Sequence, residues 1–227
     1  MASNKIAIII PAFNEETTIN FVIKEIFDLI DDKINIIVVS DCSSDNTASV
    51  ANESGAIVLE LTKNHGYAGA INEGLSHAIA KLDVDYLITM DADGQHDPKS
   101  VKILINRLLV NDIDLVVGKR QYTARFSEKL YSLFFKIYFK INDPLCGLKG
   151  YKKSIYLEYG TFETFDSIGT ELLTWALINN KNVSQIPVKI RSREDSPRFG
   201  SGLIINLKIL KSLTKTIAYI LINKLKN

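Results

Sequence analysis

Several features that mark particular protein classes are missing from this sequence of 227 residues. It has only two cysteines, Cys42 and Cys146, and no CxxC pair, so neither a disulfide framework nor a zinc site is expected. Its start, MASNKIAIII, lacks a basic region followed by a long apolar stretch and a cleavage site, so nothing indicates secretion. A reducing cytoplasm is therefore the expected compartment.

Long hydrophobic runs and an excess of one charge are also missing. The longest clean apolar run in the C-terminal tail is Ile217–Ile222, whereas a transmembrane helix needs about 20 apolar residues. The 27 Lys and Arg balance 26 Asp and Glu, which argues against a dedicated nucleic-acid binder. The patterns GxxxxGK[ST] and GxGxxG are absent, which disfavours P-loop nucleotidases and nicotinamide-dependent enzymes.

The balanced charge hides an uneven distribution along the chain. The last acidic residue is Asp195, and six basic residues follow it. Without those six, residues 1–195 carry 21 basic against 26 acidic side chains, a net charge of −5. This pattern predicts an acidic globular body whose basic C-terminal end meets something anionic.

Short apolar runs alternate with segments of helical period through the first 120 residues. The runs are apolar at nearly every position, as in strands buried on both faces of a parallel sheet: Ile6–Ile10, Ile34–Val39, Ile57–Leu61, Tyr86–Met90 and Ile113–Val117. The helices predicted between them are Glu16–Ile30, Ser44–Glu53, Ala68–Lys81 and Pro98–Leu109, with Asn14, Ser43 and Asp97 as N-caps. This order predicts an α/β fold with a doubly wound, mostly parallel sheet and helices on both faces.

Beyond Arg120 the strict alternation stops. The pattern predicts an aromatic-rich helix over 126–141, short strands at Leu148–Tyr151 and Val183–Ile190, a helix near Gly169–Ile178 and a final helix over Leu203–Leu225. The polar stretch 191–202 is predicted to be a mobile loop because it contains Pro197, Gly200 and Gly202. The helix over 126–141, with its lysine stripe, and the final helix are both basic and rich in apolar residues. Each either packs as ordinary core or a dimer contact, or lies in a membrane interface.

The sharpest chemical feature is MDADGQHDP, residues 90–98, where a buried strand ends in a loop. Ligands of doubly wound sheets collect outside the carboxyl ends of the strands. Asp91 and Asp93 can both face one divalent cation there, and Gln95 can add a carbonyl oxygen, which favours Mg²⁺ or Mn²⁺. Such an ion bridges a diphosphate and neutralises its charge as it leaves. The alternative is that this segment is only a turn and a helix cap.

The first two strands end in IPAFNEE and VVSDCSSDNT, and both deliver polar groups to the edge that holds Asp91. Phe13 can stack on a nucleobase, and Asp41 can accept hydrogen bonds from a base or a ribose. Asp45 and Asn46 are better explained as helix-capping residues.

Seven motifs in a fixed order together resemble the family 2 glycosyltransferases of the GT-A fold, which is Rossmann-like. The resemblance is strongest to the branch of dolichyl- and polyprenyl-phosphate mannosyl- and glucosyltransferases. The motifs are IPAFNEE, VVSDCSSDNT, KNHGYAGAINEGL, ITMDADGQHDP, DLVVGKR, NDPLCGLKGYKK and SREDSPRFGS. The resemblance covers residues 5 to about 202, so we expect a GT-A domain over 1–202 and a basic amphipathic C-terminal helix over 203–227.

The resemblance implies roles for particular residues. It implies nucleotide binding by Pro11, Phe13, Glu15, Asp41 and Asp91, and metal binding by Asp91, Asp93 and Gln95. Arg120 and Arg125 would contact an acceptor phosphate, and Arg198 would contact the nucleotide diphosphate or the acceptor phosphate. Asp93 and these three arginines form the implied catalytic set.

The implied reaction is an inverting, metal-dependent transfer of a sugar from a nucleotide-diphosphate donor to a polyprenyl phosphate. The expected protein is peripheral at the cytoplasmic face of an anionic membrane, binds no nucleic acid and can be a homo-oligomer. Two departures from the family pattern affect base selectivity and phosphate contacts: Ser40 and Asp41 stand where paired acids are usual, and Gly202 follows Ser201 where lysine is common.

Three alternatives stay open at this point. The same fold can act on a sugar hydroxyl of a surface polysaccharide, with Asp166 or Glu171 as general base. A sugar nucleotidyltransferase would show a glycine-rich, basic loop after the first strand, where this chain has PAFNEE. A non-catalytic binding module is disfavoured by the intact Asp91 and Asp93.

Overall fold

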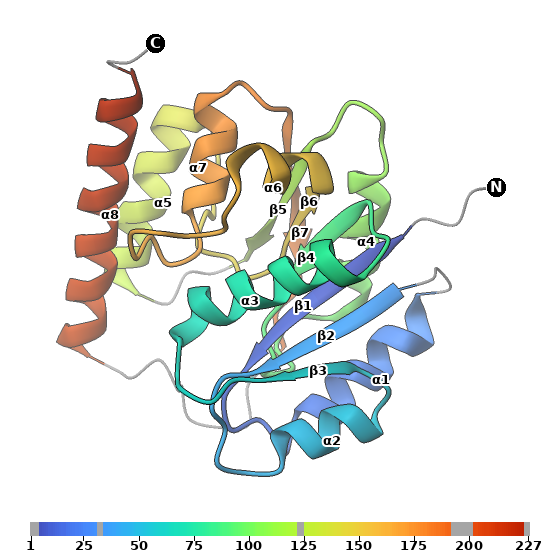
Figure 1. Cartoon of the computed structure of the whole chain (residues 1–227). Coiled ribbons are helices and arrows are strands. Elements are labelled where there is room, and N and C mark those ends of the chain that lie inside the picture. Colours follow the sequence, from blue (N-terminus) through green and yellow to red (C-terminus); the bar gives the residue numbers. More distant parts are fainter. Residues whose placement is uncertain (1–4, 31–33, 122–124, 192–201, 225–227) are drawn as a thin grey trace.

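The computed structural model describes residues 5–30, 34–121, 125–191 and 202–224 (Figure 1). One seven-stranded sheet has the order β3-β2-β1-β4-β6-β5-β7. Its strands are β1 Ile6–Ala12, β2 Ile34–Ser40, β3 Ile57–Glu60, β4 Tyr86–Thr89, β5 Leu115–Arg120, β6 Lys149–Lys152 and β7 Val183–Val188. All neighbouring strands are parallel except β6, which runs antiparallel to β4 and β5. The predicted mostly parallel sheet is confirmed.

Helices cover both faces of this sheet (Figure 1). They are α1 Ile19–Leu29, α2 Thr47–Glu53, α3 Gly66–Lys81, α4 Pro98–Leu108, α5 Phe126–Phe139, α6 Lys153–Tyr159, α7 Glu171–Ile178 and α8 Leu203–Lys224. Because side chains alternate along a strand, β1 sends Ile8 into the core beneath α1 and α4 and Ile9 into the core shared by α3, α5 and α7. Burial on both faces explains why the central strands are apolar at nearly every position.

Of the three predicted helix caps, the structure confirms one and contradicts two. Asp97 caps α4 as predicted, because its Oδ1 accepts a hydrogen bond from the backbone N of Lys99 at 3.0 Å. The predicted caps Asn14 and Ser43 are wrong, since α1 begins after Thr18 and α2 begins after Asn46. Asn14 has a φ of 56° and binds the backbone of Ser44 at 2.8 Å, so it joins the loops after β1 and β2.

The long C-terminal helix α8 packs against α5 and α7. Its Ile205 and Ile209 are buried in the same core as Tyr131 of α5. The hydroxyl of Tyr131 lies 2.8 Å from the Oγ1 atoms of both Thr170 and Thr216, so one buried group joins α5, the start of α7 and α8. Within the described ranges, no helix is both long enough and apolar enough to span a membrane.

Candidate active site

The carboxyl ends of β1, β2 and β4 meet at one edge of the sheet, as the sequence predicts. Ala12 is the register partner of Ser40, and the backbone N of Asp41 donates to the carbonyl of Ala12 at 2.8 Å. On the other side of β1, the backbone N of Met90 donates to Ile9 at 3.1 Å. These contacts bring the loops that carry Phe13, Asp41 and Asp91 together.

The residues with implied nucleotide roles differ in how far they reach solvent. The Phe13 ring is 46% exposed, so it offers a surface on which a base can stack. Asp41 is buried, and its Oδ1 accepts a hydrogen bond of 2.6 Å from the backbone N of His65. Glu15 is buried too and accepts from the hydroxyl of Thr18 at 2.8 Å. Asp41 and Glu15 therefore also shape the loops around the site.

The loop after β4 turns sharply and presents its carboxylates at the sheet edge. Gly94 has a φ of 70°, a conformation that favours glycine, and the Oδ1 atom of Asp93 accepts from the backbone N of Gln95 at 3.1 Å. The Asp91 side chain is 35% exposed, so its carboxylate is accessible to a ligand.

Behind Asp91 the backbone of Gly147 comes unusually close. A Cβ atom at Gly147 would lie 2.3 Å and 2.4 Å from the two carboxylate oxygens of Asp91, so only glycine fits there. The hydroxyl of Thr89 donates to the carbonyl of Gly147 at 2.8 Å and fixes this contact. Tyr67 bounds the same carboxylate: its burial, followed by the charge and hydrogen bond of Asp91, raises the pKa of Tyr67 well above its usual range.

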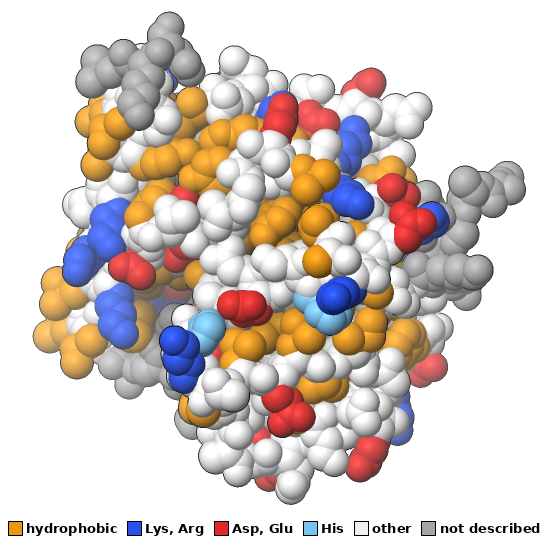
Figure 2. All heavy atoms as spheres, viewed as in Figure 1, with side chains coloured by type: hydrophobic (Ala, Val, Ile, Leu, Met, Phe, Trp, Pro, Cys, Tyr) orange, Lys and Arg blue, Asp and Glu red, His pale blue; other side chains and the backbone are white. Residues whose placement is uncertain are grey.

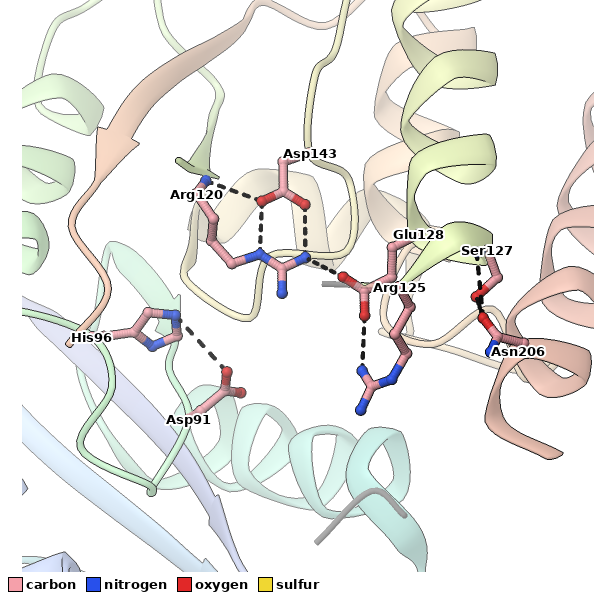
Figure 3. Close-up of polar contacts among 8 residues, drawn as sticks. All are labelled: Asp91, His96, Arg120, Arg125, Ser127, Glu128, Asp143 and Asn206. Atoms are coloured by element: carbon pink, nitrogen blue, oxygen red, sulfur yellow. Dashed lines mark hydrogen bonds and ion pairs between the residues drawn. The ribbon is translucent and has the colours of Figure 1, made fainter. Parts of the chain in front are cut away.

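His96 supports the loop from the other side. It is buried, and its Nε2 atom lies 3.8 Å from Oδ2 of Asp91 (Figure 3). A β-bridge pairs His96 with Ile190, and the backbone N of Arg191 donates to the carbonyl of Gln95 at 2.9 Å. The loop with the two aspartates is therefore tied to the chain that follows β7.

These residues suit a divalent ion that shares its ligands with a substrate. The described part of the chain has no cluster of three His, Cys, Asp or Glu side chains that could hold a metal alone. Asp91, Asp93 and Gln95 supply hard oxygen donors on one loop. Gly94 makes the turn of this loop, and Gly147 lets the backbone pack directly against the Asp91 carboxylate. Mg²⁺ is typically bound by one or two carboxylates plus substrate phosphates, so this partial set fits such an ion.

Across from Asp91, the end of β5 and the start of α5 carry an arginine cluster (Figure 3). Arg120 binds Asp143 through Nε at 2.8 Å and through a terminal N at 2.9 Å, a bidentate pair. Burial alone would lower the pKa of Arg120, but the hydrogen bonds and charge of Asp143 outweigh it and raise this pKa. The guanidinium therefore stays charged and rigidly oriented.

Arg125, the N-cap residue of α5, completes the cluster. It donates to Oε1 of Glu128 at 2.8 Å, while Oε2 of the same carboxylate lies 3.4 Å from Arg120. Glu128 is buried, so it holds both guanidinium groups together. The structure thus brings together two of the predicted arginines. The third, Arg198, lies outside the described residues, as does most of the predicted mobile loop.

Comparison with known proteins identifies the family. The model of glycosyl transferase family 2 matches residues 7–160. The chain belongs to glycosyltransferase family 2. The enzyme is 28% identical to the UDP-N-acetylglucosamine–dolichyl-phosphate N-acetylglucosaminyltransferase of Methanococcus voltae, over 94% of this chain and 96% of that protein. It is 27% identical to the dolichol-phosphate mannosyltransferase of Pyrococcus furiosus, over 93% of this chain and 64% of that protein.

Solved structures confirm the GT-A fold of this glycosyltransferase. Glucosyl-3-phosphoglycerate synthase from Mycobacterium tuberculosis, in complex with phosphoglyceric acid, superposes with a TM-score of 0.76 at 21% identity, over 95% of this chain and 80% of that one. The same synthase in complex with Mn²⁺, UDP and phosphoglyceric acid gives a TM-score of 0.74 at 20% identity, over 95% and 78% of the two chains. At this identity the likeness concerns the fold.

The two candidate general bases for a hydroxyl acceptor have different surroundings in this glycosyltransferase. Glu171 is fully buried and accepts hydrogen bonds from the hydroxyl of Thr164 at 2.7 Å and from the hydroxyl of Tyr159. Asp166 pairs with Lys215 at 2.7 Å, and this hydrogen bond and charge lower the pKa of Asp166. Glu171 is thus enclosed by the protein, whereas the Asp166 side chain is 89% exposed beside its lysine partner.

Sequence reasoning missed the groups that position the predicted residues. Local pattern does not indicate Asp143 and Gly147, because their partners Arg120 and Asp91 lie 23 and 56 positions away in the chain. Glu128 resembles any acid in the first turn of a helix, although its partners Arg125 and Arg120 lie 3 and 8 positions before it. The signal that was available is the motif NDPLCGLKG, which contains both Asp143 and Gly147. His96 lies within MDADGQHDP, where only the oxygen donors had an obvious chemical role.

Proposed function

We propose that this glycosyltransferase is an inverting enzyme that moves a sugar from a nucleotide-diphosphate donor onto a polyprenyl- or dolichyl-type phosphate. The observation that carries this proposal is that Asp91 lies across from the pair Arg120 and Arg125 (Figure 3). One side of the site thus offers carboxylates for a metal-bound diphosphate, and the other offers cations for a phosphate acceptor. The names of the Methanococcus and Pyrococcus relatives, which both contain a dolichyl or dolichol phosphate, support the acceptor.

On the donor side, Phe13 stacks on the base and Asp41 accepts hydrogen bonds from the base or ribose. Asp91, Asp93 and Gln95 would hold Mg²⁺ or Mn²⁺, which neutralises the charge that develops on the departing diphosphate. The Mn²⁺ and UDP in the mycobacterial synthase support this choice of ion and donor class. Arg198 remains a predicted contact to one of the phosphates.

On the acceptor side, Arg125 and Arg120 orient the phosphate so that its oxygen attacks the anomeric carbon from the face opposite the diphosphate. This geometry inverts the configuration at that carbon. A phosphate monoester is already anionic at neutral pH and needs no general base. The enclosure of Glu171 within the protein supports an acceptor of this kind.

The test compares two acceptors with a matched donor. Thermal-shift screening of nucleotide-diphosphate sugars, with and without Mn²⁺, first identifies the donor that stabilises the fold. That donor is then offered with polyprenyl phosphate and with a free oligosaccharide in parallel reactions. We expect transfer to the lipid phosphate, and none by the Asp91→Asn control. Transfer to the oligosaccharide alone would reject the proposal in favour of a hydroxyl acceptor.

A further inference from the structure

Large apolar side chains are strongly exposed on two adjacent helices, α5 and α8. On α5, Phe126 is 70% and Ile137 is 75% exposed. On α8, Leu203, Ile204 and Leu207 are 81%, 70% and 64% exposed. We name this surface the α5–α8 face. Leaving such a concentration of apolar surface in water is unfavourable, so the face is expected to meet a partner.

The two helices run side by side in the same direction. At their amino ends, Ser127 donates to Oδ1 of Asn206 at 2.6 Å, and at their carboxyl ends Lys224 lies 4.7 Å from the ring centre of Tyr138. Their exposed sides therefore form one continuous surface. At the amino ends of the helices this surface begins next to Arg125, the residue directly before Phe126.

Helical spacing places most of the apolar residues toward the middle of this surface and most of the lysines toward its margins, while Ile204 lies among the lysines of α8. In α5, Tyr138 faces α8, so a rotation of about 100° per residue places Ile137 on the side nearer α8 and Lys136 on the far side. In α8, Asn206 faces α5, so the same rotation places Leu203 nearer α5 and Lys208 farther away. Figure 2 shows hydrophobic side chains gathered at the lower end of α8 and basic side chains along its length.

Neither helix carries an exposed acid of its own, although Lys215 pairs with Asp166 from the loop before α7 at 2.7 Å. Residues 203–224 contain no Asp or Glu, and the only acid of α5, Glu128, is buried against the arginine cluster. A second copy of the chain packed across a twofold axis would bring lysines near lysines, which is unfavourable. An apolar centre with basic margins instead complements a bilayer with anionic headgroups.

We propose that the α5–α8 face docks on an anionic membrane surface and thereby opens the acceptor side of the active site toward the lipid. The inference rests on the proposed function, because it takes the acceptor phosphate to be held at Arg125. A lipid bound there would leave its hydrocarbon chain over Phe126 and Leu203 at the amino ends of the two helices. The membrane contact and the acceptor entrance are then one surface.

Vesicle co-sedimentation with the whole enzyme tests this proposal without donor or sugar acceptor. We expect salt-sensitive binding to phosphatidylglycerol–phosphatidylcholine vesicles and weak binding to phosphatidylcholine alone. The double variant Phe126→Ser/Leu203→Ser should reduce binding about tenfold or more, since two large apolar groups no longer enter the bilayer. Its matched control is Ile103→Ser/Leu157→Ser, which changes residues of α4 and α6 that are 48% and 55% exposed.

A second pair of variants tests the charge contribution. Lys208→Gln/Lys211→Gln should weaken binding about fivefold per lysine, the equivalent of about 1 kcal/mol each near an anionic surface. Lys24→Gln/Lys81→Gln, on α1 and α3, removes the same charge elsewhere and should have a much smaller effect. Equal losses in the control and α5–α8 variants, or no loss in either, would overturn the proposal. Light scattering that shows a dimer abolished by Phe126→Ser/Leu203→Ser would overturn it in favour of self-association.

Activity separates this inference from the proposed reaction. The Lys208→Gln/Lys211→Gln variant, which changes no residue placed near the acceptor, should transfer to a short-chain, water-soluble polyprenyl phosphate at the wild-type rate and lose transfer only to long-chain acceptor in vesicles. Vesicle binding without any transfer to lipid phosphate would reject the proposed function and leave the docking surface intact. Equal transfer to vesicle-embedded acceptor by wild type and variants would reject the docking surface instead.

Discussion

At the scale of single residues, the contact between Gly147 and Asp91 links the antiparallel strand region to the candidate metal site. A methyl group at Gly147 would occupy the space of the Asp91 carboxylate, 2.3 Å from its nearer oxygen. We expect Gly147→Ala to displace Asp91 and to weaken Mn²⁺ binding about 10- to 100-fold, measured by calorimetric titration in the presence of the nucleoside diphosphate that most stabilises the wild-type protein. Gly150→Ala is the control, because its Cβ would meet the side chains of Leu104 and Leu108 of α4 and not Asp91. Equal metal affinity in wild type and Gly147→Ala would show that the contact does not position Asp91.

The two loop carboxylates themselves should matter for turnover far more than for folding. Asp91 is 35% exposed, and its only ion-pair partner is His96 at 3.8 Å within the described residues. Asp91→Asn and Asp93→Asn should each lower turnover by about 10² or more while the unfolding free energy changes by about 0.5 kcal/mol or less. The measurements are steady-state transfer and urea unfolding. Full activity in EDTA would exclude a metal role for this pair.

The two cysteines should differ sharply in reactivity. Cys42 is exposed, whereas burial raises the pKa of the Cys146 thiol to about 12. The thiolate is the reactive form, so a thiol reagent at pH 8 should modify Cys42 alone in the folded protein. Both should react in denaturant. Mass spectrometry of the alkylated protein checks this, with Cys42→Ser as control; rapid modification of Cys146 would show that the core around Arg120 opens readily.

The sequence alone is enough to predict functional residues that have a distinctive chemistry. It is not enough to predict residues whose role depends on contacts made only in the folded protein. Asp91 and Asp93 stand out because two carboxylates follow a buried strand. Asp143 carries no such signal, because its role depends on a partner 23 positions away that only the folded sheet brings near. Long-range pairs of this kind require a known register between strands, which local pattern does not provide.

At the scale of elements, the strands were predictable because burial on both faces demands continuous apolar runs. Helix α6, Lys153–Tyr159, was not predicted, because it begins directly after β6 with no loop between them, and its N-cap residue Lys152 makes no side-chain capping hydrogen bond. The start of α1 was misplaced because Asn14, a residue typical of caps, adopts a left-handed conformation and joins two loops instead. A cap residue indicates that a helix is near, but its backbone conformation decides where the helix begins.

The hydroxyl of Tyr131 is the clearest point at which separate helices depend on one group. It bonds Thr170 and Thr216 at 2.8 Å, and both threonines are fully buried. Tyr131→Phe leaves these hydroxyls with fewer partners, so we expect it to lower the unfolding free energy by about 1–3 kcal/mol. Urea denaturation measures the change. Tyr138→Phe, on the same helix and 41% exposed, is the control and should leave the unfolding free energy nearly unchanged. Equal losses of unfolding free energy in the two variants would show that the buried hydroxyl of Tyr131 contributes no particular stability.

At the scale of the whole molecule, the acidic body and basic tail predicted from the sequence fold into one structure. The second core contains residues of α3, α5 and α7 together with Ile205 and Ile209 of α8. The exposed side of α8 carries lysines and leucines, while its buried side completes this core. The buried side of α8 therefore stabilises the protein core, and its exposed side forms part of the proposed membrane contact.

This arrangement predicts that residues 1–202 cannot fold well without α8. Ile205, Ile209 and Ile220 are 8%, 5% and 2% exposed, and burying each such side chain contributes about 1.5–3 kcal/mol. Their combined loss is comparable to the total stability of a typical domain, about 5–15 kcal/mol. A chain that ends at residue 202 should therefore show a strongly reduced or absent cooperative urea transition, measured by circular dichroism.

A milder variant keeps this last prediction testable if the truncated chain is insoluble. Ile209→Ala leaves α8 in place and removes part of its buried side, so it should lower the unfolding free energy by about 2–4 kcal/mol. Leu207→Ala, two positions away and 64% exposed, should change it much less. A truncated chain with the wild-type transition midpoint, or an Ile209→Ala variant as stable as wild type, would show that α8 is an appendage. The division at residue 202 suggested by sequence would then describe independent folding units.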